Sequence, residues 1–127
     1  MDITQKNYIL YGAASIGNIV KDSLEKAGLK IIGYIDKRAY ELPIYNNLPV
    51  WSLDTIPPKY INPDTVIYVS VKNVFEHEQI ATMLYRKGFR QIIYKPYNVL
   101  LDYGSEAENI ISKIYDNIFD GKNKKKK

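Results

Sequence analysis

The sequence contains no cysteine and only one histidine, His77, among its 127 residues. Without cysteine there is no disulfide framework, no cysteine-based zinc site and no thiol nucleophile. A single histidine also excludes a metal site built from several histidines. This composition is compatible with a reducing compartment, and we predict a cytoplasmic protein.

Long apolar runs are missing as well. No segment approaches the roughly 20 apolar residues of a membrane span. The opening MDITQKN has neither the basic start nor the apolar stretch of a signal peptide. Hydrophobic residues nevertheless make up 46% of the chain, which suffices for the core of one domain of the usual size, about 100–150 residues. We therefore expect a soluble domain with no membrane span.

Positive charge gathers at the C-terminus. The net charge is +4, but the segment KNKKKK (122–127) holds five lysines, and removing these five leaves a net charge of −1. Binding to nucleic acid requires positive charge along a folded face. We expect no nucleic-acid partner, and we predict that residues 122–127 form a disordered lysine-rich tail.

Apolar periodicity predicts strands that alternate with helices. The predicted strands are 7–11, 29–36, 49–51, 65–71 and 90–95, and the predicted helices are 15–28 and 73–88. Ser15 is expected as the N-cap of the first helix and Gly28 as its left-handed C-terminal glycine. Asn73 and Glu76 predict a capping box for the second helix, which closes at Gly88.

The segment between residues 37 and 64 is rich in proline and asparagine, and we expect mostly irregular structure there, with a helical turn near 52–56. Residues 105–121 carry apolar side chains at helical spacing and predict a C-terminal helix that packs on the domain or on a partner. The alternation predicts an α/β fold over residues 1–104. We expect a three-layer, Rossmann-like, doubly wound parallel sheet with strand order about 3-2-1-4-5.

The turn GAASIG, residues 12–17, lies between the first predicted strand and helix. A dinucleotide-binding fingerprint has glycine at three places of such a turn. Gly12 and Gly17 occupy the first and third places, and Ala14 occupies the second. The free N–H groups at a helix N-terminus favour an anion, so we predict a phosphate site here. The alternative is a tight turn without a ligand.

Asp36 ends the second predicted strand, 24 residues after Gly12. An acid near this offset can bind a ribose hydroxyl. Lys37 and Arg38 follow directly and could instead attract a 2′-phosphate, so NAD and NADP remain alternatives. The loop after TVIYVSV carries Ser70, Lys72 and Asn73 and is predicted to face the glycine turn, although Asn73 also suits a helix cap.

Other residues give weaker signals of chemistry. His77 is expected as an exposed polar helix residue, with a general acid or base as the alternative. Tyr68 and Lys72 match the Tyr-x-x-x-Lys spacing of short-chain dehydrogenases, but on a strand they lie about 13 Å apart, too far for a proton relay. Trp51 and Phe75 could stack on a base and are expected as packing residues.

The segments YILYGAASIGNIVKDSLEKAG, KIIGYID, NNLPVWSLDTIP, DTVIYVSVKN and KGFRQIIY together resemble small Rossmann-like domains of bacterial surface-polysaccharide enzymes. Such domains resemble the N-terminal parts of sugar acetyltransferases and of nucleotide-sugar dehydratases or epimerases. The resemblance covers about residues 7–100. It implies NAD(P) or a nucleotide-sugar as ligand. It also implies phosphate contacts at Gly12, Ala13, Ser15, Ile16 and Gly17, ribose contact at Asp36, and a base or sugar wall at Ser70, Lys72 and Asn73.

The chain departs from the family pattern at Ala14, where glycine is usual, and it ends where those enzymes continue into a catalytic domain. We therefore expect a nucleotide-binding module that is not catalytic by itself and serves surface-polysaccharide biosynthesis within a larger protein or complex. One alternative is a small oxidoreductase completed by dimerisation. Another is an interaction domain with a vestigial pocket, which docks a partner through residues 105–121.

Overall fold

The computed structural model describes residues 6–94 together with Val99 and Leu100. The strands are β1 (Asn7–Tyr11), β2 (Ile31–Ile35), β3 (Ile44–Tyr45), β4 (Leu48–Trp51), β5 (Thr65–Val69), β6 (Gln91–Ile93) and β7 (Val99–Leu100). The helices are α1 (Ser15–Lys26) and α2 (His77–Lys87), with short 3₁₀ turns η2 (Pro58–Tyr60) and η3 (Val74–Glu76). The predicted domain limit at residue 104, the helix 105–121 and the tail 122–127 lie outside the described residues.

The strands form one sheet in the order β3-β4-β2-β1-β5-β6-β7. The five strands from β4 to β6 in this order run parallel. β3 and β7 pair antiparallel with β4 and β6 at the two edges. The fold is therefore α/β with a mostly parallel, mixed sheet. The five predicted strands correspond to β1, β2, β4, β5 and β6 and lie in the predicted order 3-2-1-4-5. The prediction missed β3 and β7, which extend the strand order at both edges and make the sheet mixed, because two-residue edge strands are too short to produce a periodic pattern.

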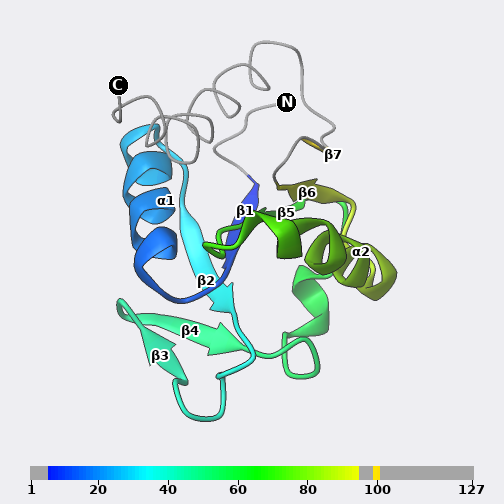
Figure 1. Cartoon of the computed structure of the whole chain (residues 1–127), viewed down its shortest axis with the longest axis horizontal. Helices are drawn as coiled ribbons and strands as arrows, with labels where there is room; N and C mark the ends of the chain where they lie inside the picture. Colours follow the sequence, from blue (N-terminus) through cyan, green and yellow to red (C-terminus); the bar gives the residue numbers. More distant parts are fainter. Residues whose placement is uncertain (1–5, 95–98, 101–127) are drawn as a thin grey trace.

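The two helices cover opposite faces of the sheet (Figure 1). Side chains alternate between the faces along a strand, and β1 shows this directly. Its residues Tyr8 and Leu10 belong to the buried cluster that contains α1 residues, whereas Ile9 and Tyr11 belong to the cluster that contains α2 residues. The core therefore has two halves, with β1 buried between them.

A hairpin occupies part of the segment that was expected to be irregular. β3 and β4 are joined by Asn46 and Asn47, whose φ angles are 52° and 62°. Two consecutive left-handed residues characterise the type I′ turn of a two-residue hairpin. The predicted short strand at 49–51 is confirmed within β4. The predicted helical turn at 52–56 is a single turn, in which the Ile56 N–H donates to the Ser52 carbonyl over 3.1 Å.

The helix ends follow the sequence in part. α1 ends as predicted: Gly28 has φ +88°, and the Leu29 N–H donates to the Leu24 carbonyl over 3.0 Å. Its start differs, because Ala14 is the N-cap and Ser15 is the first helical residue. The methyl side chain of Ala14 cannot accept a hydrogen bond, so it leaves the backbone N–H groups of the first helical turn uncapped.

The start of α2 also differs from the prediction. Asn73 Oδ1 accepts the Phe75 N–H over 3.0 Å and so caps η3, while Glu76 is the N-cap of α2. The expected capping box is therefore replaced by a 3₁₀ turn that precedes the helix. Gly88 ends α2 with φ +125°, as predicted. At 12 and 11 residues, the helices of the described part are too short and too polar to cross a membrane.

Candidate functional site

A cleft of about 380 Å³ opens where the parallel strands β1, β2 and β5 end. Ligands of α/β proteins bind outside the carboxyl ends of the strands, where the direction of strand connection reverses. In this sheet the reversal occurs at β1, because the chain continues from β1 to β2 on one side, whereas β5 is added on the other side. The lining residues are Tyr11, Asp36, Lys37, Arg38, Val71, Lys72, Asn73, Glu76 and Ile80.

The cleft combines charged and apolar groups. Lys37, Arg38 and Lys72 supply cations on exposed residues of two facing loops. Asp36 and Glu76 supply the acidic side chains, so the lining carries one more positive than negative charge. Apolar surface comes from Tyr11, Val71 and Ile80. Such a cleft suits a ligand that has both an anionic and an apolar part.

The Asp36 carboxylate is held inside the protein at the glycine turn. Its Oδ2 accepts the Ala13 N–H over 2.8 Å and the Arg38 Nη2 over 2.9 Å. Its Oδ1 accepts the backbone N–H and the Nε of Arg38, each over 2.9 Å. The Arg38 Nη2 also donates to the Ala13 carbonyl over 2.7 Å. Arg38 and Asp36 therefore clamp the turn from the end of β2.

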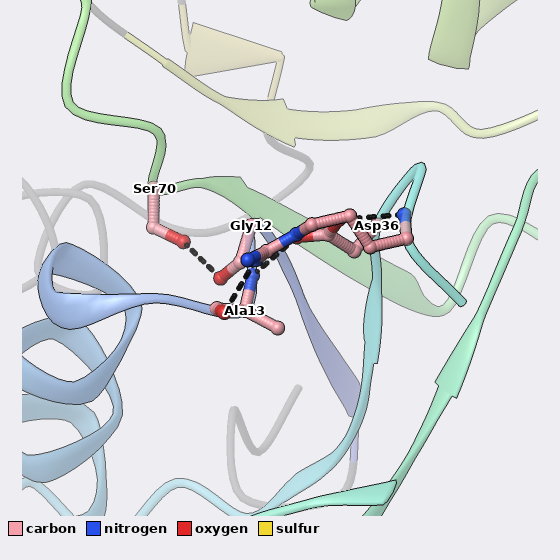
Figure 2. A network of polar contacts seen from close by, with 5 residues as sticks. Gly12, Ala13, Asp36 and Ser70 are labelled. Atoms are coloured by element: carbon pink, nitrogen blue, oxygen red, sulfur yellow. Dashed lines mark hydrogen bonds and ion pairs between the residues drawn. The ribbon is translucent and has the colours of Figure 1, made fainter. Parts of the chain in front are cut away.

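Figure 2 shows Asp36, Ala13 and Gly12 grouped at the turn, with the Ser70 hydroxyl pointing to Gly12 from the end of β5. The Ser70 side chain donates to the Tyr11 carbonyl over 3.0 Å and approaches the Gly12 carbonyl at 3.4 Å. Ser70 is 2% exposed. It therefore ties β5 to the turn from within and does not line the cleft.

The pKa of Asp36 reflects two opposing effects. Burial raises it, but the hydrogen bonds from Arg38 and from the Ala13 N–H, with the charge of Arg38, outweigh burial and hold the pKa at about 2. The carboxylate is therefore ionised at neutral pH. The pKa of the Tyr11 hydroxyl is raised by burial and then by the charges of Asp36 and Glu76. That hydroxyl stays protonated in the cleft.

Both glycines of the turn are needed by its geometry. Gly12 has φ +116°, a backbone conformation that favours glycine. A Cβ at Gly17 would lie 2.4 Å from the Gly12 carbonyl oxygen. The first turn of α1 is thus packed directly against the end of β1, as the third glycine of a dinucleotide fingerprint requires.

The phosphate site was predicted at the first-turn amides of α1. The first hydrogen bond at this end of the helix joins the Asn18 N–H to the Ala14 carbonyl over 3.0 Å. The amides of residues 15–17 precede it and have no intrahelical acceptor. The Ala13 amide, predicted to contact phosphate, already binds Asp36. Residues 12–14, 16 and 17 are not among the residues that line the cleft.

The structure brings most of the predicted site residues of the two loops together. Asp36, Lys37, Arg38, Lys72 and Asn73 all line the cleft. Four lining residues were not predicted from the sequence: Tyr11, Val71, Glu76 and Ile80. Tyr11 could have been found because it directly precedes the turn at a strand end. Glu76 and Ile80 are four apart, a spacing that places both on one face near the start of α2.

Three further side chains have expected roles outside the predicted binding site: His77, Trp51 and Phe75. His77 is 0% exposed, so the expected exposed position is wrong. It also does not line the cleft. Trp51 packs as expected, with its ring 5.5 Å from that of Tyr60. Phe75 is 91% exposed, so its expected packing role is wrong.

His77 should make stability depend on pH. Burial lowers the pKa of His77 below 6.5, against the opposing effects of the Val71 carbonyl and Glu76. Its Nε2 lies 2.7 Å from that carbonyl. The unfolded chain binds a proton near pH 6.5 and the folded chain only at lower pH, so stability is lost as pH falls below 6.5. Urea unfolding between pH 7.5 and 5.5 should show this loss.

His77→Gln is the matched variant, because its amide can still donate to the Val71 carbonyl while it cannot take up a proton. The free energy of unfolding of this variant should be flat over the same pH range. Since the chain has one histidine, a slope that persists in His77→Gln would contradict the assignment.

The chain matches no protein-family model, and no curated protein is significantly similar to it. Among the described residues, no group of three or more histidine or acidic side chains is arranged to hold a metal ion. The fold and the cleft define an α/β protein with a mostly parallel mixed sheet and a charged cleft at the carboxyl ends of its central strands.

Proposed function

We propose that this chain is a Rossmann-like module that binds a nucleotide, either NAD(P) or a nucleotide-sugar, in the cleft between the loops after β2 and β5. The observation that carries the proposal is the position of the cleft. It lies at the carboxyl ends of β1, β2 and β5, where α/β sheets bind their ligands.

The chemistry of the lining supports a nucleotide. An apolar floor of Tyr11, Val71 and Ile80 offers contact area to a base. Lys37, Arg38 and Lys72 surround it with positive charge that attracts phosphate. A diphosphate that reaches from the cleft to the first-turn amides of residues 15–17 would also meet the positive end of the α1 dipole.

The biological setting is the part of the proposal that depends on sequence resemblance alone. We propose that the module serves the modification of sugars for surface polysaccharides in the cytoplasm, as part of a larger protein or complex. It would then supply binding rather than a reaction of its own.

A thermal-shift panel tests nucleotide binding directly. The panel contains NAD, NADP, CoA, UDP-sugars and CDP-alcohols. A ligand present at a hundredfold excess over its dissociation constant stabilises the folded chain by about 2.7 kcal/mol. This corresponds to a rise in melting temperature of several degrees. Absence of a shift with every member of the panel would refute the proposed function.

Lys72→Ala should weaken binding of the best ligand by up to about fivefold, since an exposed lysine contributes about 1 kcal/mol or less of attraction to phosphate. Titration calorimetry of the variant and the parent chain measures the change. Lys30→Ala is the matched control. Lys30 is also exposed, but it lies just before the first residue of β2, at the amino end of that strand, whereas the cleft lies at the carboxyl ends of the strands. Equal losses in both variants would argue against the cleft as the binding site.

A further inference from the structure

We propose that His77 is a positioning residue of the cleft: from a buried position, its imidazole holds the loop after β5 in the conformation that receives a ligand. His77 does not line the cleft, so it acts through residues that do. The part of this inference that concerns a ligand rests on the proposed function. The contact that holds the loop can be tested without a ligand.

One side of the cleft is built from a single stretch of chain. The loop after β5 contributes Val71, Lys72 and Asn73, η3 contributes Glu76, and α2 contributes Ile80. We call these five residues the β5 wall. The wall has a loop part and a helical part, so its shape depends on how the two parts are joined.

The imidazole of His77 joins the two parts directly. Its Nε2 lies 2.7 Å from the carbonyl oxygen of Val71, six residues earlier in the chain. A carbonyl oxygen only accepts hydrogen bonds, so Nε2 carries a proton and donates. His77 is the first residue of α2, and Val71 is the first residue after β5 that lines the cleft. This bond therefore fixes the loop to the start of the helix.

The sheet does not hold this part of the loop. β5 pairs with β1 up to Val69 and with β6 up to Tyr68. Val71 lies beyond these strand pairs, and its carbonyl takes a donor from the His77 ring instead. Because a backbone carbonyl that loses its donor must find another one, removal of the ring's N–H favours other conformations of the loop.

Burial gives the imidazole a fixed position. His77 is 0% exposed, and a buried polar side chain is favourable only when it is hydrogen-bonded. Burial also lowers the pKa of His77 below 6.5, against the opposing effects of the Val71 carbonyl and Glu76. The ring is therefore uncharged at neutral pH and can stay inside the protein. The loop that it binds is held with it.

Two variants separate the hydrogen bond from the bulk of the ring. His77→Leu keeps a side chain of similar size but removes the donor, whereas His77→Gln keeps a donor for the Val71 carbonyl. Titration calorimetry with NAD and with UDP-glucose should show affinity at least about fivefold lower in His77→Leu, because only chains with the wall in place bind the ligand. His77→Gln should retain an affinity close to that of the parent chain.

Nuclear magnetic resonance tests the held loop without a ligand. The backbone order parameters of Lys72 and Asn73 should be about 0.85 in the parent chain and in His77→Gln, and should fall below about 0.6 in His77→Leu. The nitrogen shifts of the His77 ring in the parent chain should place the proton on Nε2 at neutral pH.

Ile92→Val is the matched control for a general loss of stability. Ile92 is 0% exposed on β6 and does not line the cleft. Removal of one methylene group from the core lowers stability. It should leave the order parameters of the loop and the affinity for both nucleotides unchanged.

The outcomes distinguish this inference from the proposed function. Equal affinity in His77→Leu and the parent chain, or an equal loss in both His77 variants, overturns the inference and leaves the proposed function standing. A proton on Nδ1 alone in the parent chain also overturns it, and this result requires no variant to fold. Absence of binding by the whole nucleotide panel refutes the proposed function, while the order parameters still decide whether His77 holds the loop.

Discussion

Gly17→Ala is expected to destabilise the chain by about 3 kcal/mol and to abolish binding in the cleft. An added Cβ would lie 2.4 Å from the Gly12 carbonyl oxygen, a backbone atom that cannot rotate away. In a helix, alanine is normally favoured over glycine by about 1 kcal/mol. The close contact outweighs this gain, because overpacking of a rigid region typically costs about 1–3 kcal/mol and occasionally more. Urea unfolding at neutral pH measures the difference.

Gly28→Ala is the matched control, because it adds the same methyl group where no atom lies within 4 Å. Its cost arises from the left-handed backbone alone, with φ +88°, and should be about 1 kcal/mol. It should leave nucleotide binding unchanged, since it lies at the far end of α1. A Gly17→Ala chain as stable as the parent would show that the turn is looser than described.

Asp36 should give the chain an acid-sensitive stability. Its pKa is about 2 in the folded chain against a usual value of 3.8. A lowered pKa stabilises the folded chain above about pH 4, and this stabilisation is lost as the pH falls from about 4 to 2. The two values differ by an amount that corresponds to about 2 kcal/mol or less, because water screens the half-exposed Arg38. Urea unfolding at pH 7, 5, 4 and 3 measures the loss.

Asp36→Asn should remove this part of the acid dependence and should be less stable than the parent chain at neutral pH by a similar amount. Asp54→Asn is the control, since Asp54 is exposed and lies outside the cleft. It should leave the acid dependence unchanged. If the parent and Asp36→Asn chains lose stability in parallel below pH 4, the carboxylate is not held as described.

Local structure near the glycine turn could be predicted from the sequence because its signals are short-range. An apolar run followed by Gly12 indicates the end of a strand, and the helical spacing up to Gly28 indicates the helix that follows. The left-handed backbone at Gly28 and Gly88 was also predictable, because glycine adopts it without steric cost. Where a signal spans only two residues, as in β3 and β7, prediction failed.

Burial near the start of α2 was less predictable. His77 lies between Glu76 and Glu78, two charged residues that indicate an exposed position, yet its side chain is fully buried. The opposite error occurred for Phe75, an apolar side chain that the fold leaves exposed. The 3₁₀ turn before α2 explains both errors in part, because it changes the phase of the first helical turn relative to the sequence pattern.

The sequence by itself determined the α/β alternation, the glycine turn and the two loops that carry the charged residues of the cleft. Only the tertiary structure decided that Asp36 also holds the glycine turn, because its contact with the Ala13 N–H is set by the register of β1 against β2, whereas its other donors belong to Arg38, two residues along the chain. That register places the Ala13 N–H within 2.8 Å of a carboxylate 23 residues away. Which donors reach a carboxylate depends on distances between separate strands, and residue types along one strand do not fix them.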